Sequence, residues 1–282
     1  MSQKLLSPIQ IAQFKQDGFL ILPDFVAAEE CDRLVEEADR LVAAFDPDTH
    51  KTIFSSADQS KHSNRYFFDS ADQIHFFFEP NAFTEQGGLR QDKKLSINKI
   101  GHGLHDLNPV FDSFSRQKKL QGVCNDLGLH DPLLIQSMYI FKQPRIGAEV
   151  LSHQDATYLY TDPMTVTGFW FALQDATLSN GCLYALPGGH RLGLKRKFIR
   201  NGMESVSLEE LDSTALPTDG FVPLEAKKGS LVLLHALLPH RSGPNLSDRS
   251  RHAYTLHVIE RNAHYPTENW LQRRPDFPAL GF

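Results

Sequence analysis

The sequence has few cysteines and no long hydrophobic run. Its 282 residues include three cysteines, with no CxxC pair, which argues against a disulfide framework or a thiolate zinc site and suits a reducing compartment. The longest apolar segments, such as 230–238, are far shorter than the roughly 20 residues that a membrane-spanning helix needs. Residues 1–20 lack a basic stretch followed by an apolar one. We therefore expect no secretory leader and no membrane insertion.

An excess of positive charge is also missing. The 29 basic and 34 acidic residues give a net charge of −5, so no surface-wide positive field favours nucleic acid or anionic lipid. Residues 279–282 do not form a Ser-Lys-Leu type tail, the usual peroxisomal address. We expect a cytoplasmic protein that binds no nucleic acid. The sequence leaves the oligomeric state open, with a monomer favoured.

What the sequence does contain is a helical start followed by many short strands. Ser7 and Pro8 are typical of the first turn of a helix, which Gly18 would end. Segment 29–45 has apolar residues at helical spacing and predicts a second helix. Segment 110–127 is also helical in pattern. The short apolar segments that predict strands are 74–78, 95–100, 133–141, 166–173, 181–186 and 231–238.

This order of elements predicts a mainly β fold. Many short strands after two helices, without regular strand–helix alternation, favour an antiparallel sandwich or barrel with helices packed outside. No internal repeat or linker divides the chain, so we expect one domain, 1–282, with its helical part at about 1–50. Segment 189–219 is the least strand-like and is expected to be a long lid loop. Its basic residues Lys195, Arg196 and Lys197 form either a rim for an anionic substrate or a solvated charged surface.

The first candidates for chemistry are His153 and Asp155. On an extended chain these two side chains point to the same side, although a His-x-Asp triplet alone also occurs by chance. Later in the chain an apolar strand leads to His235 and then, after Pro239, to His240. Two histidines and one carboxylate on an iron ion leave three positions open, the ligand set of non-haem Fe(II) oxygen chemistry. We prefer His240 as the second histidine, because a proline marks the end of strand pairing and the apolar surroundings of His235 are typical of a core.

Arg251 is the candidate for binding an organic anion. It follows His240 after several turn residues and is expected on a strand that returns through Tyr254. A guanidinium close to a metal can hold a carboxylate through two parallel hydrogen bonds. The alternative for Arg251 is an ion pair on the surface.

Three segments, taken together, resemble a known enzyme family. They are His153-Gln154-Asp155, then Asn180-Gly181-Cys182-Leu183 with Pro187-Gly188-Gly189-His190, and finally His240-Arg241-Ser242-Gly243-Pro244-Asn245 with Arg251. In order and spacing they resemble the phytanoyl-CoA dioxygenase family of Fe(II)- and 2-oxoglutarate-dependent oxygenases. The likeness covers nearly the whole chain, and His190 is expected to be a structural histidine in its turn.

The resemblance implies a double-stranded β-helix of jelly-roll type with iron held by His153, Asp155 and His240. It implies 2-oxoglutarate as co-substrate, with Arg251 and Ser242 on its far carboxylate. The other positions that match the family around 2-oxoglutarate are Lys99, Met138, Gln154 and Trp170. The carboxylate of the triad is present, which implies hydroxylation rather than halogenation. A small organic substrate, such as an acyl-CoA or another lipid-like acid, would then react with O2 while 2-oxoglutarate becomes succinate and CO2.

Two other classes of protein are compatible with part of this pattern. One is a cupin-type metal protein with another reaction, such as an isomerase or a zinc hydrolase, and the other is a 2-oxoglutarate-binding sensor without turnover. A non-oxygenase needs no dicarboxylate site beside its metal, so Ser242 and Arg251 favour the oxygenase. Without the resemblance, Met138 and Trp170 are ordinary core residues and Lys99 an exposed charge.

Overall fold

The computed structural model describes residues 4–56, 65–202 and 205–282. The first helix, α1 (Pro8–Asp17), begins as predicted. The Ser7 hydroxyl accepts from the Gln10 amide, and the Gln10 side chain accepts from the Ser7 amide, so two free helix N–H groups are satisfied. Gly18 ends the helix at φ 81°, a conformation that glycine adopts without steric cost.

Most predicted elements are present, with shifted ends. The helical stretch 110–127 is two helices, because the chain turns at residues 116–117 between them. The remaining helices are α2 (Ala28–Ala44), α3 (Arg65–Asp69), α4 (Leu104–Leu107), α5 (Pro109–Ser115) and α6 (Lys118–Asp126). The strands are β1 (Phe19–Leu22), β2 (Ile74–Phe78), β3 (Ile97–His102), β4 (Pro132–Ile140), β5 (Val150–His153), β6 (Thr167–Ala172), β7 (Leu183–Ala185), β8 (Arg196–Asn201), β9 (Ser205–Glu210), β10 (Val222–Leu224), β11 (Leu231–His235), β12 (His240–Ser242) and β13 (Ala253–Glu260). Among the described helices, none is both long and apolar enough to cross a membrane.

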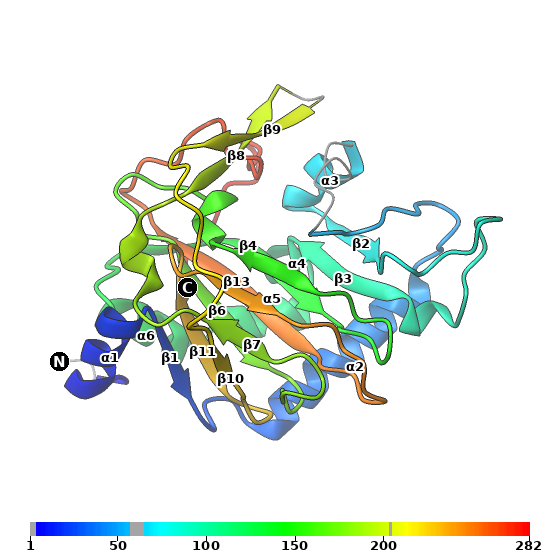
Figure 1. Ribbon diagram of the computed structural model, residues 1–282, viewed down its shortest axis with the longest axis horizontal. Coiled ribbons are helices and arrows are strands. Elements are labelled where there is room, and N and C mark those ends of the chain that lie inside the picture. The colour runs from blue at the N-terminus through cyan, green and yellow to red at the C-terminus, as the bar shows by residue number, and fades with distance from the viewer. Residues whose placement is uncertain (1–3, 57–64, 203–204) are drawn as a thin grey trace.

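Two antiparallel sheets form the body of the molecule (Figure 1). The larger has the strand order β1-β11-β6-β13-β4-β3-β2, and the smaller has the order β10-β7-β12-β5. From β4 to β7 the chain alternates between the two sheets, which is the winding of a jelly roll. The fold is therefore mainly β, as the order of elements predicted, and is the double-stranded β-helix that the resemblance implied.

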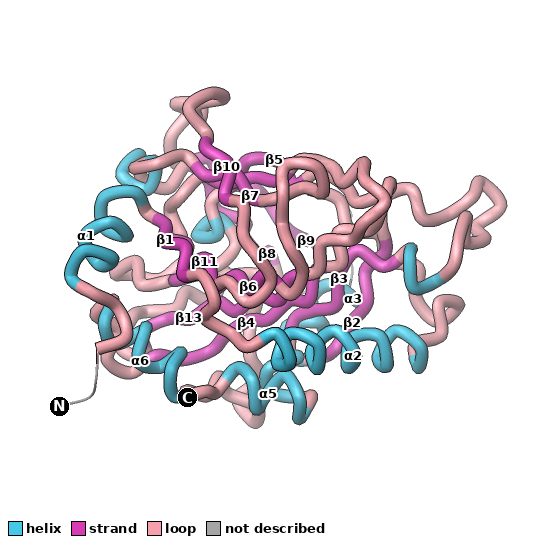
Figure 2. Tube along the Cα trace, turned by 90° about the horizontal axis from the view of Figure 1, so that it is seen from below, coloured by secondary structure: helices cyan, strands magenta, loops and turns pink. Residues whose placement is uncertain are grey.

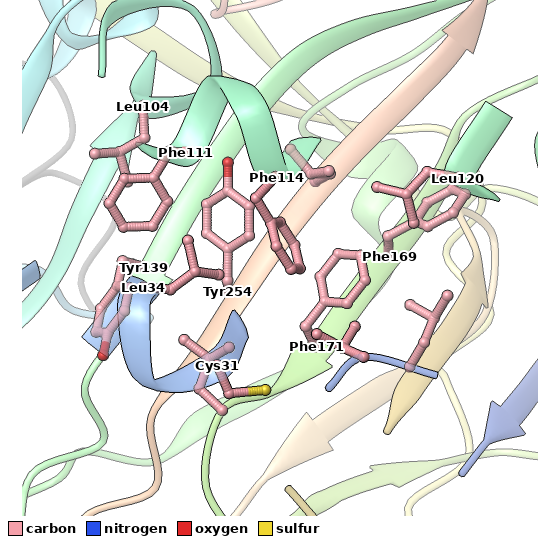
Figure 3. Close-up of a cluster of buried hydrophobic side chains, with 14 of the residues drawn as sticks. Cys31, Leu34, Leu104, Phe111, Phe114, Leu120, Tyr139, Phe169, Phe171 and Tyr254 are labelled. Carbon is pink, nitrogen blue, oxygen red and sulfur yellow. The ribbon is translucent and has the colours of Figure 1, made fainter. Parts of the chain in front are cut away.

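Helices cover the outer face of the large sheet. Figure 2 shows α2, α5 and α6 on one side of this sheet and β5, β7 and β10 on the other. Leu34 from α2 and Phe114 from α5 pack there with Phe171 and Tyr254 of the sheet (Figure 3). Because side chains alternate along a strand, Trp170 points the other way, into the space between the sheets. The inner face of the large sheet thus remains available for a site.

The segment 189–219 differs from its prediction as a lid loop. It contains a 3-10 turn at Gly189–Leu192 and a hairpin of β8 and β9, which Figure 1 shows projecting from the sheets. In β9 only Val206 and Leu208 are apolar and most side chains are exposed, so the sequence signal for a strand is weak. The prediction of a loop was wrong for this reason, whereas a role as a lid stays a prediction.

Candidate metal centre and anion pocket

The three predicted metal ligands come from two neighbouring strands of the small sheet. His153 is the last residue of β5, and Asp155 opens the 3-10 turn Asp155–Thr157 that follows. His240 is the first residue of β12, rather than the end of β11, and lies directly opposite His153 in the strand register. One ligand atom from each residue lies within 4.8 Å of the others. The structure thus brings together the three residues chosen from the sequence.

Backbone carbonyls orient both imidazoles. Nδ1 of His153 lies 2.8 Å from the Leu151 carbonyl, and Nδ1 of His240 lies 3.0 Å from the Leu238 carbonyl. A carbonyl only accepts, so each Nδ1 carries a proton and each Nε2 is the ring nitrogen that faces the site. Both Nε2 atoms lie 3.6 Å from Oδ1 of Asp155. Two imidazole nitrogens and one carboxylate oxygen therefore face the same point.

The protonation of this cluster suits a cation. Burial by itself raises the pKa of Asp155, but the attraction of His240 and His257 and a hydrogen bond from His153 hold it well below its ordinary value. Burial lowers the pKa of His240 to about 4, so its imidazole is neutral. Burial also lowers the pKa of His153, yet the hydrogen bond to Asp155 outweighs it and leaves this pKa raised. A bound metal would displace that proton, so metal affinity falls as pH decreases.

His257 is a member of the cluster that the sequence prediction missed. It lies on β13, in the other sheet, with Nε2 3.2 Å from Oδ2 of Asp155. This contact fixes the carboxylate oxygen that does not face the two histidines, as outer partners of metal ligands usually do. Its sequence neighbours are apolar core residues, and only the pairing of the sheets reveals its direction.

The triad lies where two cavities meet. A small cavity of about 140 Å³ extends from it to Arg251, and a larger one of about 750 Å³ extends the other way to β9 and the 213–218 segment. Lys99 and Met138 line both. The Lys99 Nζ lies 3.6 Å from the centre of the Phe54 ring, and burial lowers the pKa of its amine to about 7. Lys99 is thus a buried residue of the site and not the exposed charge of the alternative reading.

Arg251 ends the small cavity. It lies two residues before β13, not on the strand as expected, and is 2% exposed, so a surface ion pair is excluded. Its Nε donates to the Gly181 carbonyl at 3.2 Å, and its guanidinium lies 5.2 Å from the centre of the Trp170 ring. Among the described residues, its buried Nη1 has no hydrogen-bond partner. A buried cation with an unused donor, in a cavity that Ser242 also lines, fits a carboxylate.

The side-chain amide of Gln154 is bound to backbone groups. Its Nε2 donates to the carbonyls of Gly193 and Leu237 at 2.8 and 2.7 Å, and its Oε1 accepts from the Lys195 amide at 3.0 Å. Gln154 lines the large cavity, while its amide joins the chain before β8 to the chain after β11, so its place in the wall beside the co-substrate stays a prediction. A sequence match gives the position of a side chain but not the backbone groups around it.

The basic residues of the 195–197 segment are largely paired. The Lys195 ammonium contacts Asp212, while that of Lys197 lies 3.9 Å from the centre of the Tyr160 ring and 4.0 Å from Glu268. Arg196 is exposed and lines the large cavity. A rim for an anionic substrate would therefore depend on Arg196 rather than on all three residues.

Comparison with models of protein families matches most of the chain to one family. Residues 14–253 match the family model described as phytanoyl-CoA dioxygenase. A "Phytanoyl-CoA dioxygenase" of Arabidopsis thaliana is 45% identical, with 95% of this chain and 94% of that protein covered. The "Phytanoyl-CoA dioxygenase domain-containing protein 1" of Bos taurus is 44% identical, with 97% of each chain covered.

Solved structures give the same fold. EctD from S. alaskensis, crystallised with 2-oxoglutarate and 5-hydroxyectoine, has a TM-score of 0.68 at 22% identity, with 99% of this chain and 88% of EctD covered. The carbocyclase SnoK, described as non-heme and alpha ketoglutarate dependent, has a TM-score of 0.66 at 14% identity, with 98% of this chain and 97% of SnoK covered. These likenesses support the jelly-roll fold.

Proposed function

Because the chain belongs to the phytanoyl-CoA dioxygenase family, it is a 2-oxoglutarate-dependent dioxygenase, and we propose that it hydroxylates a lipid-like acid or its CoA ester. The observation that carries the proposal is the position of the triad between a small basic cavity and a large one. One cavity suits the co-substrate and the other the molecule to be oxidised. A cupin that catalyses another reaction does not need a cavity for 2-oxoglutarate.

His153, Asp155 and His240 would hold iron, since two neutral imidazoles and one carboxylate are its usual ligands in oxygenases. When bound with 2-oxoglutarate and O2, iron supplies the oxidation of a C–H bond to an alcohol, with succinate and CO2 as the other products. The residues of the chain position the co-substrate relative to the triad. Arg251 and Ser242 would hold the far carboxylate, so that the reacting end of the co-substrate lies at the triad.

The walls of the large cavity favour a lipid-like substrate. Aromatic and aliphatic side chains make up much of its surface; they include Phe54, Phe67, Tyr158, Leu208 and Trp270. Such walls bind hydrocarbon and exclude water from the oxidation. Relatives at 44 and 45% identity carry phytanoyl-CoA in their names, and the exposed Arg196 at this cavity suits a phosphate of CoA. The three free, buried cysteines are consistent with the cytoplasm as its compartment.

Succinate formation with matched substrates tests the proposed substrate class. We expect a branched or long-chain acyl-CoA, or its free acid, to raise succinate formation above the rate without substrate. If CoA is the head group, Arg196→Gln should raise the KM for the acyl-CoA severalfold at low salt and leave that for the free acid unchanged. Arg33→Gln, an exposed arginine on α2, is the matched control. Succinate formation that no lipid-like acid or ester stimulates would contradict the substrate class but not the dioxygenase.

Gly181 gives a prediction about the anion pocket. Its φ is +84°, and a Cβ here would lie 2.7 Å from Cε of Lys142, while its carbonyl holds Arg251. Gly181→Ala should therefore displace both cations and raise the KM for 2-oxoglutarate by about tenfold, the effect of one lost charge-assisted contact. Gly128→Ala is the control, because Gly128 has φ +96° but nothing within 4 Å of the added atom. Equal values of this KM in the two variants would contradict the role of Gly181.

A further inference from the structure

Lys142 is a second buried cation beside the small cavity. It follows β4, is 2% exposed and lines the cavity together with Arg251. Its Nζ donates to the Ser242 hydroxyl at 2.9 Å and to the Ala148 carbonyl at 2.6 Å. An ammonium has three N–H groups, so these contacts account for two of them. Nothing in the sequence motifs pointed to this residue.

The contact between Lys142 and Ser242 determines the direction of the hydroxyl proton. A charged ammonium has no lone pair, so the Ser242 oxygen must accept from it. The hydroxyl then has its own proton left to donate toward the cavity. If the amine of Lys142 were neutral, the hydroxyl could donate to the amine instead and would offer the cavity only lone pairs. Charged Lys142 thus makes Ser242 a donor.

We propose that Lys142 positions the co-substrate: on binding of the far carboxylate of 2-oxoglutarate it takes up a proton, orients the Ser242 hydroxyl as a donor and adds a second positive charge to that of Arg251. The inference rests on the proposed function, since it assigns the small cavity to 2-oxoglutarate. It adds a positioning residue and a proton that is bound together with the co-substrate.

The charges around Lys142 favour this uptake. Burial and the nearby Arg251 lower the pKa of Lys142 to about 7, whereas Glu79 and Glu149 act in the opposite direction. Glu79 is buried and accepts from Asn98 and from the Ala148 amide, on the same peptide segment that Lys142 contacts. A carboxylate that enters beside Arg251 relieves the repulsion between the two cations. The pKa of Lys142 must then rise, because a new negative charge favours the protonated amine.

The charge of Lys142 makes the binding of 2-oxoglutarate depend on pH. Below pH 7 the free protein already carries the proton, so binding of 2-oxoglutarate takes up little. Above pH 7 the free amine is mostly neutral, and the bound state gains between about half and one proton at pH 8. Affinity for 2-oxoglutarate should therefore fall as pH rises from 7 to 9. The co-substrate itself does not titrate in this range, because carboxyl groups ionise near pH 4.

Calorimetry on the Mn(II)-loaded protein without O2 measures this proton directly. Titrations of 2-oxoglutarate at pH 8 in two buffers with different ionisation enthalpies should show uptake, and those at pH 6 should show almost none. The wild-type protein provides its own control with 2-oxobutyrate, a 2-oxo acid without the far carboxylate, which should bind without uptake. Absence of uptake with 2-oxoglutarate at pH 8 would overturn the proposal without any variant.

Substitution of Lys142 provides a second test of the proposal. Lys142→Met should raise the dissociation constant of 2-oxoglutarate about tenfold or more and abolish the uptake, while Mn(II) affinity stays within twofold of wild type. Lys118→Met, an exposed lysine on α6, should behave as wild type. Uptake that persists in Lys142→Met assigns the proton to another group and refutes the proposal. A wild-type protein that binds Mn(II) but not 2-oxoglutarate would instead contradict the proposed function.

Discussion

His240→Ala should abolish both Mn(II) binding and succinate formation, whereas His235→Ala should leave both close to wild type. The Nε2 of His240 faces Asp155, and its Nδ1–H is held by the Leu238 carbonyl. Removing one of three ligands destroys an open site, because an iron ion held by two protein ligands is readily lost. Calorimetric titration with Mn(II) in the absence of O2 measures the effect directly, and succinate formation with Fe(II) measures its consequence.

His235 is a demanding control, because it lies close to His240 in the sequence and its ring also packs against other side chains. It ends β11, its Nδ1 accepts from the Leu237 amide at 3.1 Å, and its ring lies 5.0 Å from that of His190. His235→Ala should lower the melting temperature, since a lost hydrogen bond costs about 1 kcal/mol. Asp155→Ala should reproduce the loss of metal binding. Normal Mn(II) affinity in His240→Ala, or its loss in His235→Ala, would transfer the ligand role to His235.

The sequence predicted the elements of the fold better than their contacts. Helix α2 followed from apolar residues at helical spacing and strand β6 from a short apolar run, because both patterns reflect burial. The hairpin β8–β9 did not, since most side chains of its second strand are exposed and only Val206 and Leu208 in it are apolar. The ends of strands were also uncertain, and the sequence did not show that His240 begins a strand in the other sheet.

The same limit applies to the candidate site. His153, Asp155 and His240 were found because their types and spacing match a known ligand set. His257 and Lys142 were missed, because each reaches the site from a strand, or a strand end, of the large sheet that the motifs do not include. Their contribution depends on which strands pair and which faces meet. Those properties arise from the whole chain and not from a local motif.

Substitution of Arg251 is the other change for which we expect a large effect, on the KM for 2-oxoglutarate. Arg251→Lys should raise the KM for 2-oxoglutarate by about tenfold to a hundredfold, because a charge-assisted contact is worth about 1.5 to 3 kcal/mol. The guanidinium donates to the Gly181 carbonyl through Nε and has Nη1 unused among the described residues, so one planar group serves the backbone and a carboxylate together. A lysine lacks this fork and cannot replace both contacts. Arg251→Ala should lose more, since the carboxylate would be buried without that cation.

Two readouts separate this effect from damage to the metal centre. Mn(II) affinity should stay near wild type in both Arg251 variants, because Arg251 does not contact the triad in the described structure. Arg249→Lys, an exposed arginine two residues away, should leave the KM for 2-oxoglutarate unchanged. Steady-state succinate formation against 2-oxoglutarate concentration, at saturating Fe(II) and O2, provides the measurement. A KM within about twofold of wild type in both Arg251 variants, far below the tenfold that 1.4 kcal/mol implies, would remove Arg251 from the co-substrate site. The small cavity would then need another ligand, and the strongest structural argument against a non-oxygenase cupin would be lost.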